Sequence, residues 1–229
     1  MSAYFVTATG TDIGKTFVAS GLLRHLRAQR KVVAGIKPVI SGFDIAKARA
    51  SDTGELLDAM GEAVTPEAVE QISPWRFIAP LSPDMAAARE GKSIDFDALV
   101  AFCRDAAAWP GTLLIEGVGG VMVPLDAGHT VLDWMAALGL PAVLVTGSYL
   151  GTISHTLTAA RVMAQAGVKI AALVLNDSGD GAVPLDDTVA SLRRFLPETP
   201  LVVLPRGAGE ADFGRLADEL FQRDSKNTP

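Results

Sequence analysis

The sequence predicts a three-layer α/β fold, in which a mainly parallel β-sheet is covered by helices on both faces. Short runs rich in β-branched residues alternate along the chain with longer segments of helical periodicity. Most of the short runs are apolar throughout, which is typical of strands buried on both faces of a sheet. Strands separated by helix-length segments are joined in parallel, so the helices lie on the faces of the sheet.

Six buried strands are expected, and helical patterns lie between most of them. The expected strands cover residues 4–7, 32–37, 113–116, 142–146, 170–176 and 201–204. The expected helices include residues 16–29, 96–108, 130–138 and 152–166. The segment 43–91 contains several prolines and helical patterns but no convincing buried strand, so we interpret it as a helical and loop excursion from the sheet. No repeat or linker marks a boundary, and we expect a single domain.

Composition favours a soluble protein that acts on a small molecule. With 49% apolar residues among 229, the chain can bury one substantial core. The formal net charge of −6 gives no broad attraction to nucleic acid or to an anionic membrane. The N-terminus lacks the pattern of a signal peptide, and no stretch approaches ~20 uninterrupted apolar residues. We therefore expect a cytoplasmic protein with no nucleic-acid or membrane partner.

The cysteine and histidine residues do not suggest catalysis or zinc binding. Cys103 is the only cysteine and lies in an amphipathic helical pattern, where a buried structural thiol is expected. His25 and His129 have no metal-ligand companions at useful spacing.

A phosphate-binding loop is predicted directly after the first strand. A strand, a glycine-containing loop and a helix follow one another, so backbone N–H groups and the positive end of the helix can surround phosphate oxygens. Lys15 would place a cation on the phosphates, and Thr16 would offer a hydroxyl to Mg²⁺. The pattern G-x-x-x-x-G-K-[ST] is met except at its first position, where Thr9 stands. The alternative is an ordinary turn with an incidental lysine. The predicted loop comprises Gly10, Thr11, Asp12, Ile13, Gly14, Lys15 and Thr16.

A lysine and a small hydroxyl residue follow the second strand. Lys37 ends an apolar run, and Ser41 stands beside Gly42 shortly after it. Ligands of open α/β sheets bind beyond the carboxyl ends of the strands, so both residues are candidates for a site. A solvent-facing lysine and an ordinary turn explain these residues equally well.

A glutamate and three glycines follow the third strand. Glu116 ends a buried strand, where a carboxylate is unexpected unless it binds something. Gly117, Gly119 and Gly120 would let the backbone approach a ligand closely. The alternative is a glutamate that caps a helix or forms a salt bridge.

Two more polar positions have both a structural and a functional interpretation. Asp52 lies at the expected start of a helix, where it would cap free N–H groups or join Glu116 as a second carboxylate for Mg²⁺. Asn176 and Asp177 end the fifth strand and would either read a nucleotide base or form an Asx turn. Spacing alone does not decide between these roles.

In combination, these motifs resemble the dethiobiotin synthetase family. The similarity extends in order over nearly the whole chain. The matching segments are the phosphate loop, Lys37-Pro38, Ser41-Gly42, Ser51-Asp52, Ser82-Pro83, Glu116-Gly117-Val118-Gly119-Gly120, Leu150-Gly151-Thr152 and Asn176-Asp177. The resemblance implies a single P-loop ATPase-like domain over residues 1–229, with a three-layer P-loop NTPase-like fold.

The resemblance also implies an activity. Such enzymes use ATP and Mg²⁺ to carboxylate and cyclise 7,8-diaminononanoate with CO₂, which yields dethiobiotin, ADP and phosphate for biotin biosynthesis. The reaction proceeds through a carbamate and a carbamic-phosphoric anhydride, and the family acts as a homodimer.

Residue roles follow from the same resemblance. Lys15, Lys37 and Ser41 would be catalytic, and Thr16, Asp52 and Glu116 would hold Mg²⁺. The family usually has asparagine where Ser154 stands and glycine where Ala8 stands. The nucleotide would contact Asp12, Ile13, Gly14, Lys15, Thr16, Phe17, Asp52, Glu116, Gly117, Val118, Gly119, Asn176, Asp177, Pro205, Arg206 and Gly207. The substrate would contact Thr11, Asp12, Lys37, Ser41, Gly151, Thr152 and Ser154. The last three lie at the expected start of a helix, where free N–H groups suit a carboxylate. Plain N-capping is the alternative for these three residues.

Two other functions remain possible for this fold. A cobyrinate-type amidoligase would activate a carboxylate with ATP, although such chains normally continue into a glutamine-hydrolysing domain. A partition-type ATPase switch would use hydrolysis to govern partner binding, although that class usually carries a further lysine early in its loop. Residues 8–13 contain no lysine.

Overall fold

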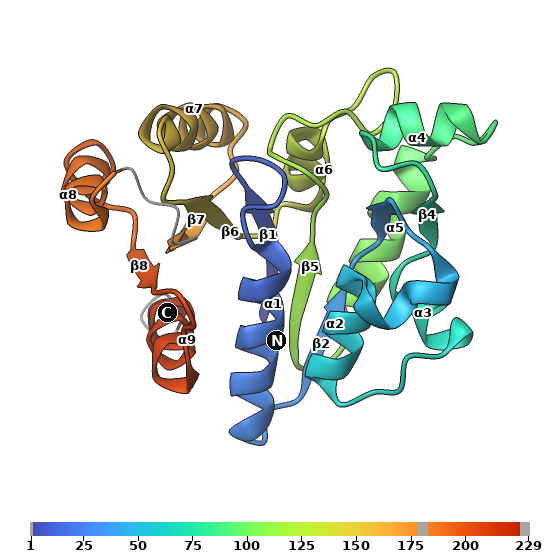
Figure 1. Ribbon diagram of the computed structural model, residues 1–229, viewed down its shortest axis with the longest axis horizontal. Coiled ribbons are helices and arrows are strands. Elements are labelled where there is room, and N and C mark those ends of the chain that lie inside the picture. The colour runs from blue at the N-terminus through green and yellow to red at the C-terminus, as the bar shows by residue number, and fades with distance from the viewer. Residues whose placement is uncertain (1, 178–182, 225–229) are drawn as a thin grey trace.

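The computed structural model describes residues 2–177 and 183–224 (Figure 1). Their centre is a six-stranded sheet in the order β2-β5-β1-β6-β7-β8, and all of its neighbouring strands are parallel. The strands are β1 (Ser2–Ala8), β2 (Val33–Ile36), β5 (Thr112–Glu116), β6 (Ala142–Gly147), β7 (Ile170–Asn176) and β8 (Leu201–Leu204). All six strands predicted from the sequence are therefore confirmed, and no strand end is shifted by more than two residues.

The helices match the predicted patterns closely. The helices are α1 (Lys15–Ala28), α2 (Asp52–Met60), α3 (Pro66–Ile72), α4 (Pro83–Arg89), α5 (Phe96–Ala107), α6 (Val131–Leu138), α7 (Thr152–Gln165), α8 (Leu185–Phe195) and α9 (Glu210–Asp224), with a 3₁₀ helix η1 (Ile45–Ala50). Thr130 precedes α6 and forms a capping box with Asp133, which explains where that helix begins.

Contacts of the central strand show that helices cover both faces of the sheet. Successive side chains of a strand point to opposite faces. Tyr4 donates its hydroxyl proton to the carbonyl of Leu220 in α9, at 3.0 Å. Its neighbour Phe5 packs edge-on against Trp134 of α6, with ring centroids 4.8 Å apart. The expected three-layer arrangement is thereby confirmed, and α1 packs between α2 and α9 on the first face (Figure 1).

The segment after β2 differs from the prediction. The strand stops at Ile36, because Lys37 donates its N–H to the carbonyl of Ile72 outside the sheet and Pro38 has no N–H to donate. The chain then forms β3 (Val39–Ser41), which pairs in parallel with β4 (Trp75–Phe77). The predicted excursion from the main sheet is confirmed, and it also contains the short strand β4, of whose residues only Phe77 is buried. A three-residue strand is too short for periodicity to reveal it.

Cys103 lies on the buried face of α5, as the sequence predicted. Burial raises the pKa of its thiol to about 12. Since the thiolate is the reactive form, we expect the folded protein to resist a thiol reagent at pH 8 and to react fully after denaturation in guanidinium. A spectrophotometric titration of thiols measures the extent of reaction in the folded and in the denatured protein. Complete reaction before unfolding would contradict this burial.

Within the described ranges, no helix combines the length and apolar character that a bilayer crossing requires.

Candidate active site

A cavity of about 630 Å³ lies at the carboxyl end of the sheet, beside the loop that follows β1. Segments distant in sequence converge on it, including the loops after β1, β3 and β5 and the start of α2. The predicted site residues that line it are Thr11, Asp12, Gly14, Lys15, Thr16, Lys37, Ser41, Asp52, Val118 and Gly119.

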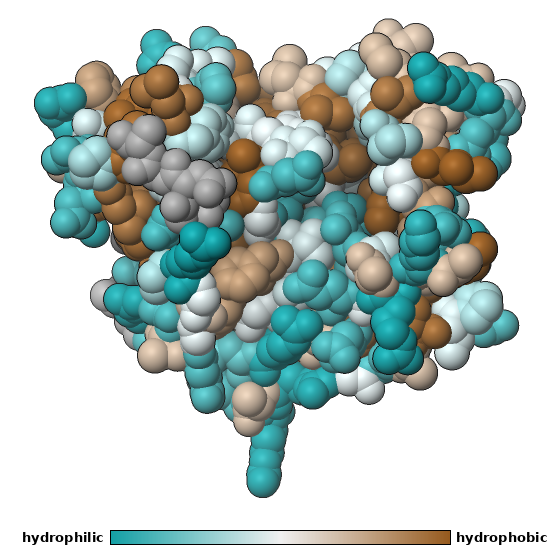
Figure 2. All heavy atoms as spheres, viewed as in Figure 1, coloured by the Kyte–Doolittle hydropathy of each residue, from teal (hydrophilic) through white to brown (hydrophobic). Residues whose placement is uncertain are grey.

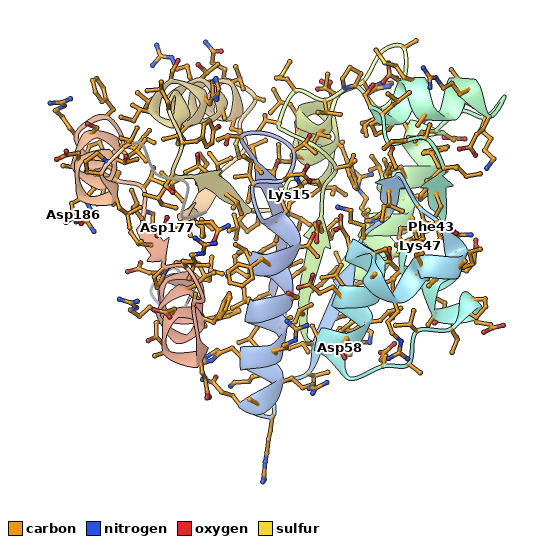
Figure 3. The ribbon with its side chains drawn as sticks, viewed as in Figure 1. Lys15, Phe43, Lys47, Asp58, Asp177 and Asp186 are labelled. Carbon is orange, nitrogen blue, oxygen red and sulfur yellow. The ribbon has the colours of Figure 1, made fainter. Side chains whose placement is uncertain are left out.

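The loop between β1 and α1 has the geometry expected of a phosphate site. Gly14 has φ 101°, a left-handed conformation that favours glycine, and it precedes α1 without any side-chain cap. The free N–H groups of the first turn of α1 are thus left for a ligand. Figure 3 shows Lys15 at this end of α1. Its Nζ lies 3.3 Å from the carbonyl oxygen of Gly10, so the side chain folds back across the loop.

Lys15 is buried, with 7% of its surface exposed. Burial, and then the nearby charge of Lys37, lower the pKa of Lys15 to about 8. An incidental surface lysine would be exposed, so this environment favours the phosphate-binding interpretation over an ordinary turn.

Lys37 forms an ion cluster with two carboxylates, of which Glu116 is buried and Asp52 is partly exposed. Its Nζ lies 2.6 Å from Oε1 of Glu116 and 2.8 Å from Oδ2 of Asp52. Lys37 is 3% exposed and Glu116 is 1% exposed, so the solvent-facing alternative for Lys37 is wrong. Burial alone would lower the pKa of Lys37, but the two carboxylates outweigh it and raise the pKa above the ordinary value. The ammonium group is therefore charged and fixed in position.

The two carboxylates respond differently to this ammonium group. Burial raises the pKa of Glu116, and the charge of Lys37 opposes that rise only in part. Asp52 is less buried, so the charge of Lys37 outweighs desolvation and lowers its pKa. Asp52 is the first residue of α2 but does not cap it, because Ser51 is the N-cap and accepts from the N–H of Gly54.

Oxygen atoms suitable for Mg²⁺ gather beside the phosphate loop. Thr16 donates its hydroxyl proton to Oε1 of Glu116 at 2.8 Å, whereas Oε2 of Glu116 is buried without a hydrogen-bond partner. Hydroxyl and carboxylate oxygens are the ligand types that Mg²⁺ prefers, so the residues present fit this ion. In the part of the chain that is described, no three His, Cys, Asp or Glu side chains form a metal site by themselves. A bound Mg²⁺ would thus also need oxygen atoms from phosphate and water.

Two unsatisfied hydroxyl groups face the same cavity. Oγ of Ser41, at the end of β3, and Oγ of Ser82, just before α4, are both buried without a partner. Buried hydroxyls are normally hydrogen-bonded, so both are suited to a ligand. Ser82 was not among the predicted site residues. The only sequence signal for it is the dipeptide Ser82-Pro83.

The predicted substrate residues at the start of α7 do not line this cavity. Thr152 is buried and donates its hydroxyl proton to the carbonyl of Gly147 at 2.6 Å, so its side chain shapes the turn. Thr146 lies 2.8 Å from the Thr152 hydroxyl and 3.3 Å from the Thr9 hydroxyl. The start of α7 is thereby tied to the phosphate loop. Ser154 lies exposed in the first turn of α7, which has Gly151 as its N-cap.

The predicted nucleotide-base residues lie on the other side of the phosphate loop. Asn176 donates from Nδ2 to the carbonyl of Ile13 at 3.0 Å, and Asp177 accepts from the hydroxyl of Ser148 at 2.9 Å. Phe17 lines a second cavity of about 340 Å³, between α1 and the start of α9. Pro205, Arg206 and Gly207 are exposed in the turn that leads from β8 toward this second cavity.

Solved structures share the fold at low sequence identity. The cell division ATPase MinD from Pyrococcus furiosus gives a TM-score of 0.54 at 18% identity, over 97% of this chain and 100% of that chain. The hydrogenase maturation factor HypB from Archaeoglobus fulgidus gives 0.58 at 13% identity, over 96% and 90%.

This fold and the loop after β1 define a P-loop NTPase-like protein. A family model described as an AAA domain matches residues 2–208. Two relatives are named ATP-dependent dethiobiotin synthetase BioD. The protein from Acidiphilium cryptum (strain JF-5) is 54% identical over 87% of this chain and 91% of its own length. The protein from Caulobacter sp. (strain K31) is 48% identical over 99% of this chain and 97% of its own length. The chain belongs to the ATP-dependent dethiobiotin synthetase family. These relatives favour that assignment over an amidoligase or a partition-type switch.

Proposed function

We propose that the protein uses Mg²⁺ and ATP to close the ureido ring of dethiobiotin from 7,8-diaminononanoate and CO₂. The observation that carries the proposal is the ion cluster of Lys37 with Glu116 and Asp52, which lies beside the predicted phosphate loop in a chain of this family.

The proposed reaction has three steps. One amine of the substrate adds to CO₂ and loses a proton, which gives a carbamate. A carbamate oxygen attacks the γ-phosphorus of ATP, and ADP leaves. The second amine then attacks the carbonyl carbon, phosphate leaves, and the ring closes with loss of a proton. Negative charge builds up on phosphoryl oxygens, so catalysis rests on positioning and electrostatic stabilisation.

The residues around the cavity divide this work. The loop N–H groups and Lys15 bind the phosphates, and Lys37 stabilises the phosphoryl group during transfer. Thr16, Asp52 and Glu116 would hold Mg²⁺, which supplies positive charge to the phosphate oxygens. Lys37 pairs with both carboxylates, so the net negative charge of the cluster is smaller than that of the two carboxylates alone.

Substrate binding would use the other side of the cavity. The unsatisfied hydroxyls of Ser41 and Ser82 can hydrogen-bond the carbamate or an amine. Asp12 and Thr11, exposed on the phosphate loop, face the same cavity and suit the cationic diamine. The first turn of α7, with Gly151, Thr152 and Ser154, lies outside this cavity and would bind the substrate carboxylate through the N–H groups that remain free, since the N–H of Thr152 already donates to the carbonyl of Tyr149.

The proposal includes a cytoplasmic homodimer in which residues 1–229 act as one domain. The dimer is supported by exposed apolar side chains. Met122 and Leu150, in loops at the carboxyl end of the sheet, are 56% and 82% exposed, and Ile78 and Met85, in the segment around α4, are 75% and 57% exposed. On the face of the molecule drawn in Figure 2, apolar side chains lie mainly in the upper half, whereas the lower half is mostly hydrophilic. Apolar side chains that gather on one part of a surface favour association there.

Phosphate release with Mg-ATP and bicarbonate, measured with and without 7,8-diaminononanoate, tests the proposed reaction. We expect release that depends on the diamine, together with dethiobiotin detected by mass spectrometry. ATP binding with no stimulation by the diamine would retain the phosphate site but refute this substrate.

A further inference from the structure

Asn176 contacts the phosphate loop directly across a sequence separation of 163 residues. It ends β7 and pairs with Gly147 of β6 on one side and Leu204 of β8 on the other, so its backbone is held inside the sheet. Its amide Nδ2 donates to the carbonyl oxygen of Ile13 at 3.0 Å. The same amide packs against Gly14, because a Cβ added there would lie 2.3 Å from Nδ2.

This hydrogen bond fixes the direction of a neighbouring N–H group. The carbonyl of Ile13 and the N–H of Gly14 belong to one planar trans peptide and point in opposite directions. A donor that holds the carbonyl on the side of β7 therefore aims the N–H away from β7. Gly14 also lines the large cavity, on whose surface Lys15 and Thr16 lie beside it.

The bond is needed because glycine does not fix this peptide by itself. Gly14 has φ 101° and precedes α1, and glycine reaches both signs of φ at little cost. Without the amide of Asn176, the carbonyl of Ile13 would lose its side-chain donor, and the peptide could rotate. The N–H of Gly14 would then be aimed at phosphate for only part of the time.

We infer that Asn176 is a positioning residue of the phosphate site, acting through the peptide between Ile13 and Gly14. The inference rests on the proposed binding of phosphate by this loop. It assigns to Asn176 a role that does not depend on the base of the nucleotide, unlike the base contact that the family resemblance implies.

A ligand without a base separates the two roles. We expect Asn176→Ala to weaken the binding of ATP, GTP and inorganic tripolyphosphate by the same factor, about three- to tenfold, as the loss of one hydrogen bond predicts. Isothermal titration calorimetry at a single pH and Mg²⁺ concentration measures all three. A loss confined to ATP would show that Asn176 reads the base and would overturn the inference, as would unchanged binding of all three.

Two further variants guard against a general loss of structure. Asn176→Leu keeps the side-chain volume but removes the donor, so it should reproduce the factor seen with alanine. Ser148→Ala removes the hydrogen bond to Asp177 at the same edge of the sheet and should leave tripolyphosphate binding within about twofold. Equal weakening by Ser148→Ala would mean that the edge, and not the amide of Asn176, is responsible. Tripolyphosphate binding involves no diamine, so a failed dethiobiotin assay would leave this test valid.

Discussion

Lys37→Ala is expected to lower kcat by about 10²- to 10³-fold, the usual effect of removing one preorganised charge from a transferring phosphoryl group. The structure adds an expected loss of stability. Removing the ammonium group takes away the cation in direct contact with the buried Glu116, and breaking a buried ion pair in this way costs about 3–5 kcal/mol in the free energy of unfolding. Single-turnover kinetics and denaturant unfolding measure the two effects separately.

A second substitution separates catalysis from stability. In the double variant with Lys37→Ala and Glu116→Gln, the buried carboxylate is replaced by a neutral amide. We expect part of the lost stability to return, while turnover stays low because the ammonium group and a carboxylate proposed to bind Mg²⁺ are both missing. Recovery of turnover together with stability would show that Lys37 serves only to neutralise Glu116.

Lys47→Ala is the matched control for Lys37→Ala. Lys47 lies on η1, is 81% exposed, and has only a distant pairing with Asp44 at 3.8 Å (Figure 3). Its removal should leave turnover unchanged. It should alter the free energy of unfolding by no more than about 0.5 kcal/mol.

Lys15→Ala is expected to weaken ATP binding by about ten- to a hundredfold and to lower kcat as well. A charge-assisted hydrogen bond to phosphate contributes to both the bound state and the transition state. Equilibrium titration with ATP and steady-state kinetics provide the two numbers. If affinity and rate both survived, the loop after β1 would not be the phosphate site.

The pKa of Lys15 adds a dependence on pH. At a pKa of about 8, Lys15 carries its charge below pH 8 and loses it above. Bound phosphate favours the charged form, so ATP affinity in the wild-type protein should be greatest below pH 8 and fall as the pH rises through that value. The fall should be absent in Lys15→Ala. A fall of equal size in the variant would assign it to another group.

The sequence by itself determined the order of the elements and the place of the phosphate loop. Apolar runs of strand length fixed the six strands of the sheet, because burial on both faces is visible within each run. The loop could be found because Gly14, Lys15 and Thr16 act within one short segment, where glycine chemistry and the helix start are local properties.

Only the tertiary structure decided which side chains meet. Lys37 and Glu116 lie 79 residues apart in sequence, and they meet because β2 pairs with β5. Asn176 reaches Ile13 because a single strand, β6, separates β7 from β1 in the order β2-β5-β1-β6-β7-β8. That order depends on how the helices pack on the two faces, which no local pattern contains. For the same reason, the sequence left Lys37 open to a solvent-facing interpretation, Asp52 open to a capping role, and the short strand β4 unseen.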